Sequence, residues 1–313
     1  METQYKYSSK KEYMHSSGPI PIFELSDFKI INNDSNIIKN FNGLYFPVFY
    51  GVNYALLLND YIGTFLKLKK DYPDLKIIFF TSKNLKNIVN KPGFEIASDD
   101  FIKYFNCELV DVDTDNYFFD KIILTEGDLP VIPHHIYSGS QWRYNELSEP
   151  VKYWWCDSLK EITNYFNKEL FDLEGKKLYI TRKFVNKIYH SKNDSWSIKR
   201  RHDVMYDDLF ENELIKNKYF VFDGNGEGFF KQINLSYNAK IFVSIEGSSF
   251  FNAIWCKDET PIVVIKVKDD YTFYHAELLR MLNKKNVIEI DVSKMNPKDG
   301  ISFIIETINK IIE

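Results

Sequence analysis

The feature that most constrains the fold is the regular alternation of short apolar runs with helical stretches in the second half of the chain. The runs are rich in β-branched and aromatic residues and lie at residues 176–181, 218–223, 240–246, 261–267 and 286–292. Stretches with helical periodicity lie between them at residues 205–217, 228–239, 249–257 and 272–285, and the amphipathic segment 300–313 ends the sequence. Strands that alternate with helices form βαβ units around a parallel sheet. The sequence therefore predicts the α/β class.

The first half of the chain has a less regular pattern of the same kind. Runs suited to strands lie at residues 44–50, 75–81, 107–113 and 120–126, and helical spacing is found at 53–72, near 98–106 and over 154–172. We expect one α/β domain over residues 1–172 and a second over 173–313, with a cleft between them. Ligands of parallel sheets bind beyond the carboxyl ends of the strands, so the loops after the strands are the candidate sites.

Composition argues against several classes of protein. The net charge is -4 over 313 residues, whereas a general nucleic-acid binder has a strongly basic face. Cys107, Cys156 and Cys256 are widely spaced and form no C-x-x-C pair. Neither a zinc site nor a disulfide framework is therefore indicated, and a reducing compartment is expected.

The sequence also carries no sign of secretion or of a membrane span. Residues 1–18 lack the apolar core of a signal peptide, and no stretch approaches the roughly 20 apolar residues of a membrane helix. Richness in Lys, Asn and Ile indicates an AT-rich genome. We expect a soluble protein in bacterial or viral-host cytosol, and the sequence leaves its oligomeric state open.

One strand runs directly into a loop of small residues. Residues 240–245 are followed by Glu246, Gly247, Ser248 and Ser249, and helical spacing begins at once. Small residues let a phosphate approach the backbone, and a helix amino terminus favours negative charge. A serine cap on a helix is also a common structural feature, so the loop alone leaves both interpretations open.

Arginines near this loop favour the phosphate interpretation. Arg182 directly follows the strand at 176–181, and Arg200 and Arg201 lie shortly after it. Guanidinium groups suit bidentate phosphate contacts better than lysine does. The alternative is a solvated basic loop, because residues 183–202 are rich in lysine.

The order of these motifs resembles the catalytic half of glycosyltransferase family 61. By this resemblance Arg182 matches the first motif arginine and Gln232 the helix glutamine, while Gly247, Ser248 and Asn252 match the loop and the helix after it. Residues 51–80 resemble the N-terminal segment of the family, and the whole resemblance covers residues 45–265.

The chain departs from the family pattern at several positions. Glu246 stands where the family has the loop histidine, and Leu56 where it has the histidine of the N-terminal helix. Lys183 replaces the second motif arginine, and Asp207 and Asp208 replace an Asn-Glu pair. These changes indicate a divergent member, or a related family of the same architecture, and they leave the donor and the catalytic base open.

The resemblance implies an inverting transfer of a hexose or pentose from a nucleotide-sugar, with UDP the expected nucleotide, to a saccharide or glycoprotein hydroxyl. It also implies two Rossmann-like domains facing a central cleft, a GT-B-like fold, with the acceptor side in 1–172 and the donor side in 173–313. On this resemblance we expect Arg182, Arg201 and the backbone amides of residues 247–249 to stabilise the departing diphosphate.

The acceptor hydroxyl needs a general base. We expect Asp60 in this role, with His135 or its neighbour His134 as second choice. Asp60 is equally interpretable as an exposed helix carboxylate.

The rival functions are a nucleotide-sugar epimerase on the same scaffold and a catalytically inactive sugar- or nucleotide-binding protein. We expect the Glu246 carboxylate to contact donor sugar or a basic side chain, because a carboxylate beside phosphate is unfavourable.

Three further patterns carry weaker signals. Asp111, Asp113 and Asp115 form a D-x-D string of the kind that holds a divalent metal against a diphosphate, but we expect no obligatory metal. Residues 223–228 match the start of a calcium loop, yet its twelfth position is Asn234 rather than glutamate, and we interpret them as a turn. An aromatic cluster is either core or a sugar-stacking platform; its members are Trp142, Tyr144, Trp154 and Trp155.

Overall fold

The computed structural model describes the following parts of the chain: residues 4–7, 12–15, 18–21, 28–31, 39–49, 69–70, 72–81, 104, 106–111, 117–122, 136–138, 141–143, 160–165, 175–224, 229–269 and 274–312. The chain divides into two compact units, Met1–Ile132 and Pro133–Glu313. The domain boundary expected after residue 172 stays a prediction.

The first unit is built on a mixed sheet in the order β4-β1-β8-β5-β6-β7. Its strands are β1 (Gln4–Tyr7), β4 (Phe28–Ile31), β5 (Lys39–Phe49), β6 (Lys76–Thr81), β7 (Cys107–Asp111) and β8 (Tyr117–Ile122). The four strands from β8 to β7 are parallel to one another, and β1 runs antiparallel to both its neighbours. A separate ladder joins β2 (Glu12–His15) to β3 (Gly18–Pro21).

The second unit contains a five-stranded sheet in the order β12-β11-β13-β14-β15, with every neighbouring pair parallel. The strands are β11 (Lys177–Ile180), β12 (Tyr219–Phe222), β13 (Ile241–Ile245), β14 (Ile262–Lys266) and β15 (Val287–Asp291). They coincide with the apolar runs of the sequence, so the α/β class is confirmed. A second Rossmann-like domain and a GT-B cleft stay predictions. A short ladder joins β9 (Ile136–Ser138) to β10 (Gln141–Arg143).

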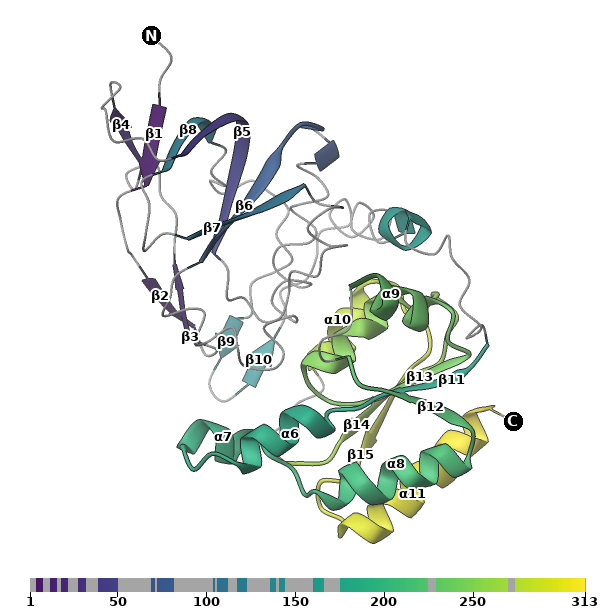
Figure 1. Cartoon of the computed structure of the whole chain (residues 1–313). Helices are drawn as coiled ribbons and strands as arrows, with labels where there is room; N and C mark the ends of the chain where they lie inside the picture. The colour runs from purple at the N-terminus through teal and green to yellow at the C-terminus, as the bar shows by residue number, and fades with distance from the viewer. Residues whose placement is uncertain are drawn as a thin grey trace. The chain divides into compact units, whose positions relative to one another are not determined.

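Helices cover both faces of this sheet (Figure 1). The helical elements are α6 (Lys183–His190), α7 (Ser195–Arg200), α8 (Met205–Lys216), α9 (Phe229–Tyr237), the 3₁₀ helix η3 (Ser248–Trp255), α10 (Tyr274–Met281) and α11 (Pro297–Ile312). Helices α8 and α11 lie on one face, and α9 and α10 lie on the other. Residues 160–165 are also helical, inside the helix predicted over 154–172.

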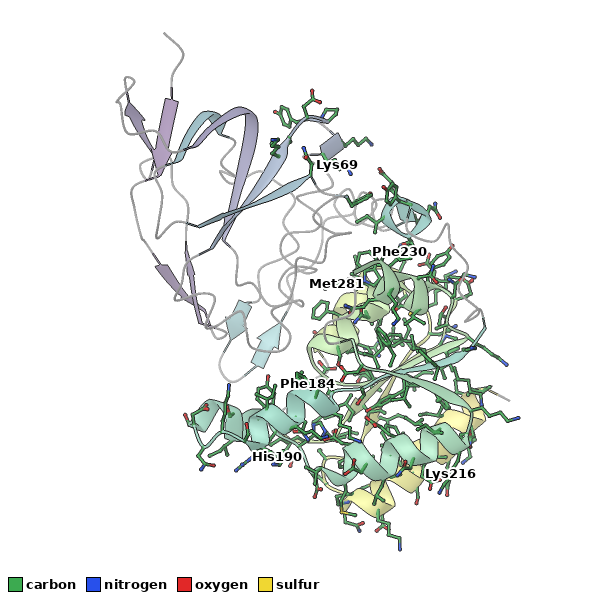
Figure 2. The ribbon with its side chains drawn as sticks, in the orientation of Figure 1. Lys69, Phe184, His190, Lys216, Phe230 and Met281 are labelled. Carbon is green, nitrogen blue, oxygen red and sulfur yellow. The ribbon has the colours of Figure 1, made fainter. Side chains whose placement is uncertain are left out.

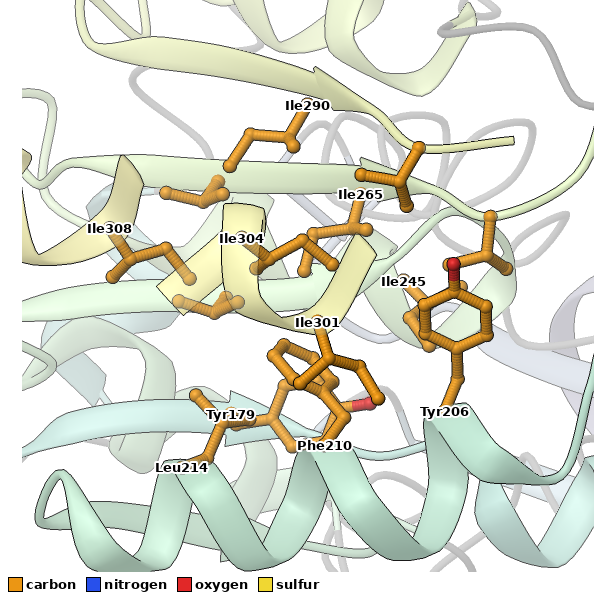
Figure 3. Close-up of a cluster of buried hydrophobic side chains, with 14 of the residues drawn as sticks. Tyr179, Tyr206, Phe210, Leu214, Ile245, Ile265, Ile290, Ile301, Ile304 and Ile308 are labelled. Atoms are coloured by element: carbon orange, nitrogen blue, oxygen red, sulfur yellow. The ribbon is translucent and has the colours of Figure 1, made fainter. Parts of the chain in front are cut away.

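The core between the sheet and the α8–α11 layer consists of large apolar side chains (Figure 3). Helix α11 contributes Ile301, Ile304 and Ile308, and α8 contributes Phe210 and Leu214. Each of these side chains is at most 5% exposed. Burying these side chains contributes roughly 25 cal/mol of stabilising free energy per Å² of apolar surface. This packing holds the two helices against the sheet.

Local sequence sets where several of these helices begin. Asp194 caps α7, because its carboxylate accepts from Ser197 N at 2.8 Å. Asn296 caps α11 by accepting from Asp299 N at 3.0 Å, and Pro297 occupies the first helical position, where its missing N–H costs nothing. This cap starts α11 three residues before the amphipathic segment that the sequence indicates. The helical segment expected at 249–257 is a 3₁₀ helix that begins at Ser248.

Close packing of α11 against α8 yields a testable prediction at Gly300. A Cβ atom at this buried glycine would lie 2.6 Å from Tyr206 Oη. Alanine in a helix gains about 1 kcal/mol over glycine, but overpacking costs about 1–3 kcal/mol. We expect Gly300→Ala to lower the free energy of unfolding, as measured by urea denaturation.

A second substitution should reverse this loss. The buried Tyr206 hydroxyl has no hydrogen-bond partner among the described residues, so Tyr206→Phe removes no hydrogen bond and should be neutral or stabilising. Without that oxygen, the atom nearest to a Cβ at Gly300 is Val292 Cβ at 3.3 Å. The double variant should therefore unfold at a higher urea concentration than Gly300→Ala alone, and an equal midpoint would contradict the proposed clash.

Candidate active site

The carboxyl edge of the parallel sheet contains a topological switch point between β11 and β13. From β11 the chain passes along α6, α7 and α8 to the outer neighbour β12, and then returns through α9 to β13 on the other side of β11. The loops after β11 and β13 therefore leave in opposite directions. Ligands of open parallel sheets bind in the crevice that such a reversal creates, and the candidate residues Arg182 and Glu246–Ser249 follow these two strands.

Arg182 joins the two loops. It directly precedes α6 and is only 7% exposed. Its Nη1 donates a hydrogen bond to the backbone carbonyl of Glu246. A buried guanidinium is stable only where its donors have acceptors. This contact therefore places a fixed positive charge at the switch point, and the role of Arg182 in donor binding stays a prediction.

Gly247 is required by this arrangement for two independent reasons. Its φ of 137° lies where side chains are strained. A Cβ atom there would also lie 2.6 Å from Arg182 Cζ and 3.0 Å from Arg182 Nη2. The backbone of Gly247 and the guanidinium of Arg182 are thus in close contact, and the first η3 bond follows from Phe250 N to Gly247 O at 2.9 Å.

Glu246 is a buried residue, 2% exposed, at the end of β13. Its backbone N–H donates to Ile265 O at 2.8 Å, which continues the pairing with β14. Arg182 contacts the Glu246 main-chain carbonyl. The expected contact of the Glu246 carboxylate with donor sugar or a basic side chain stays a prediction.

Polar side chains hold the loop after β13 in its shape. Ser244 Oγ donates to Ile180 O at 2.9 Å and lies 3.3 Å from Ser249 Oγ. Asn252, 1% exposed, donates from Nδ2 to Ser249 O at 3.1 Å. Asn252 therefore contacts the loop backbone from within the fold. Ser248 belongs to η3, but its side chain lies outside the described residues.

Gln232 and Arg201 lie on other elements of the same unit. Gln232, on α9, is 8% exposed and contacts the loop after β12, where its Nε2 lies 3.4 Å from Gly224 O. Arg201 is half-buried at the carboxyl end of α7. Within the described residues, Arg201 forms no hydrogen bond with Gly247. Its role at a leaving group stays a prediction, and the side chain of Arg200 lies outside the described residues.

A buried polar network supports the loop that carries Arg182, and sequence reasoning missed it. His202 Nε2 lies 2.9 Å from Asp207 Oδ1, and Asn186 Nδ2 donates to Asp207 Oδ2 at 2.6 Å. Asn186 also accepts from His202 N at 3.0 Å. All three residues are at most 5% exposed. The network ties α6 to α8, so the basic segment after Arg182 forms ordered helices rather than a solvated loop.

The two adjacent aspartates of α8 have different surroundings. Asp207 belongs to the buried network, whereas Asp208 is exposed and pairs with Lys183 Nζ at 2.7 Å. The hydrogen bond from Lys183 lowers the pKa of Asp208, and the same bond raises the pKa of Lys183. Lys183 also lies 3.4 Å from Glu211 Oε2. Lys183, which replaces a family arginine, therefore has two carboxylate partners beside the site.

Burial gives His202 a predictable effect on stability. Desolvation lowers the pKa of His202, with added repulsion from Arg182 and His190, and this outweighs the Asp207 carboxylate that raises it. The unfolded chain, with an ordinary histidine pKa of about 6.5, then binds a proton more readily than the folded protein. The stability from this group is therefore present above about pH 6.5 and is lost as the pH falls below it.

We expect the free energy of unfolding to fall as the pH is lowered from about 7.5 to 5. Urea denaturation at several pH values measures this dependence. The His202→Gln variant, which has no titrating ring here, should show a smaller slope over the same window. Equal slopes for the two proteins would contradict the assignment to His202.

Several predicted site residues lie outside the described parts of the chain: Asp60, His134, His135, Asp113, Asp115, Tyr144, Trp154 and Trp155. Asp111 ends β7 and Trp142 lies in β10, but their side chains are likewise not described.

The described residues contain no group of three or more His, Cys, Asp or Glu that could hold a metal ion. Among the helices that the structure describes, none is long and apolar enough to cross a membrane.

The fold and the Arg182–Gly247 contact define an α/β protein with a buried cation and a glycine backbone at the switch point of a parallel sheet. In open α/β sheets the ligand binds at such a switch point. Comparison with known families assigns the class more closely. Residues 68–263, more than half of the chain, match the family model of Glycosyltransferase 61. The chain therefore belongs to glycosyltransferase family 61, and this membership implies that it is a glycosyltransferase with donor and acceptor substrates. A comparison with curated proteins finds no match.

Proposed function

We propose that the protein is an inverting glycosyltransferase that moves a hexose or pentose from a nucleoside-diphosphate sugar to a saccharide or glycoprotein hydroxyl. UDP is the expected nucleotide. The observation that carries the proposal is the contact between Arg182 and the Glu246–Gly247 backbone at the sheet's switch point, within the span that matches the family.

In the proposed reaction the acceptor oxygen attacks the anomeric carbon as the bond from that carbon to the diphosphate breaks. The acceptor proton passes to a base, for which we propose Asp60 or His135, and the departing nucleotide takes the electron pair of the broken bond. Negative charge grows on the diphosphate in the transition state. A guanidinium that is already held in position stabilises this transition state most strongly, because no free energy is spent on moving it into place.

The proposed donor site lies in the second unit. Arg182 joins the loops after β11 and β13 through the Glu246 carbonyl, and we propose that its planar guanidinium also contacts the diphosphate in a bidentate manner. Ser244 and Asn252 would act as positioning residues, since Ser244 Oγ donates to Ile180 O at the end of β11 and Asn252 Nδ2 donates to Ser249 O in η3. We propose that no divalent metal is obligatory, which predicts that turnover continues in EDTA.

A panel of nucleotide-sugars tests the proposal. Release of nucleoside diphosphate should require both one donor of the panel and a saccharide or glycopeptide acceptor, and the anomeric configuration of the product should be opposite to that of the donor. Appearance of an epimer from donor alone, or nucleotide binding without any transfer in the presence of acceptors, would overturn the proposal.

A further inference from the structure

A hollow of about 250 Å³ lies beside the candidate diphosphate site. It is lined by Thr181, Lys183, Phe184, Lys187, Glu211, Val221 and Asp223. Thr181 and Lys183 flank Arg182 in the sequence, and Val221 and Asp223 come from the carboxyl end of β12. The hollow therefore adjoins the switch point on the side of β12. Sites for whole small molecules measure about 300–1,000 Å³, so this one suits one part of a ligand.

The charges around the hollow do not suit a phosphate. Lys183 already pairs with Asp208 at 2.7 Å and with Glu211 at 3.4 Å. Glu211 is buried, and Thr181 Oγ1 donates a hydrogen bond to it. The lining lysines Lys183 and Lys187 balance the carboxylates of Glu211 and Asp223, so the hollow offers no excess positive charge for a phosphate. The ligand part that fits is neutral.

The remaining lining offers the contacts that a nucleoside uses. Phe184 lies near the start of α6 (Figure 2) with its side chain 40% exposed, so its ring has a surface on which a base can stack. Asp223 is exposed directly after β12, at the strand end where dinucleotide-binding sheets place the carboxylate that accepts from ribose hydroxyls. Val221 adds an apolar wall.

We propose that this hollow binds the nucleoside part of the donor, with Phe184 stacked on the base and Asp223 accepting hydrogen bonds from the ribose. The inference rests on the proposed function, since it takes Arg182 as the diphosphate anchor. It adds the direction of the donor: the nucleoside lies toward β12, and the transferred sugar lies on the other side of the diphosphate. Phe184 and Asp223 then determine nucleotide affinity without contributing to phosphate binding.

Titration calorimetry on the full chain tests the proposal with three ligands: inorganic pyrophosphate, the tightest binder among UDP, GDP, CDP and ADP, and its 2′-deoxy form. We expect Phe184→Ala to weaken nucleotide binding about 5- to 100-fold, the range of base–aromatic stacking. Asp223→Asn should weaken it about tenfold or more and reduce the preference for the ribonucleotide, as expected for a hydrogen bond to a charged group. Pyrophosphate affinity should stay within about twofold in both variants.

Matched controls exclude general effects of the substitutions. Phe303 on α11 has a similarly exposed ring, 44% against 40% for Phe184. Glu259 is an exposed carboxylate before β14, at the opposite edge of the sheet. Phe303→Ala and Glu259→Gln should change neither nucleotide nor pyrophosphate binding.

The outcomes separate this inference from the proposed function. If the wild-type protein binds neither nucleotide nor pyrophosphate, or if Arg182→Lys leaves pyrophosphate binding unchanged, the donor site itself is wrong and the inference falls with it. If Arg182→Lys weakens both ligands while Phe184→Ala and Asp223→Asn leave the nucleotide-to-pyrophosphate ratio unchanged, only the nucleoside assignment is overturned. If a further titration with the corresponding nucleotide-sugar shows that the Phe184 and Asp223 variants weaken its binding but not that of the nucleotide, the nucleoside assignment is overturned and the hollow belongs to the transferred sugar.

Discussion

Replacing Arg182 with lysine should lower the rate of sugar transfer by about 100- to 1,000-fold, the typical effect of removing one preorganised donor from a transition state. Arg182 is buried, and its Nη1 holds the Glu246 carbonyl. An ammonium group keeps the charge but lacks the planar set of donors that can contact the carbonyl and a phosphate together. We expect turnover to fall much more than the melting temperature. Initial rates at saturating acceptor measure the effect.

Lysine is the informative substitution because alanine would also remove structure. Arg182→Ala leaves a void and an unsatisfied carbonyl inside the fold, which costs stability as well as activity. Arg280→Lys is the matched control, since Arg280 on α10 pairs with Glu289 at 2.5 Å, away from the loops after β11 and β13. It should keep full turnover. An Arg182→Lys enzyme with more than about a third of the wild-type rate would remove Arg182 from the site.

Gly247→Ala should abolish donor binding and lower stability. Strain at the positive φ of 137° costs on the order of 1–3 kcal/mol, and the new Cβ would lie 2.6 Å from Arg182 Cζ. The guanidinium must then leave the Glu246 carbonyl, so the two loops lose the contact that joins them. We expect loss of nucleotide-dependent thermal stabilisation together with a lower urea midpoint.

A second glycine separates the clash from the strain. Gly175 also has a positive φ, 74°, but a Cβ atom there meets nothing within 4 Å. Gly175→Ala should therefore lower stability through strain alone and retain nucleotide binding. If Gly247→Ala binds nucleotide as well as Gly175→Ala does, the Gly247 backbone is no part of the donor site.

The strands of the second unit were predictable because each is a continuous run of β-branched and aromatic residues. Residues 241–245 and 262–265 are buried throughout, and a strand covered on both faces needs such a run. The strand–loop–helix sequence around Gly247 could be found for the same reason, since the small residues interrupt the apolar pattern directly after a buried strand.

Helices α6 and α7 could not be predicted with the same ease. Residues 183–202 are rich in lysine, a composition that indicates a solvated loop. Their order depends on contacts with α8, where Asn186 and His202 share the Asp207 carboxylate. Short helices gain most of their stability from tertiary packing, so the local sequence carries little sign of them.

The sequence by itself determined the α/β class, the strands of the parallel sheet and the residues of the loop after β13, because periodicity and residue size are local properties. The strand order, and with it the switch point, was decided only by the tertiary structure. Pairing both β12 and β13 with β11 brings Arg182 onto Gly247, 65 positions later in the chain. No local pattern encodes that contact, since it depends on how the whole sheet buries its apolar faces.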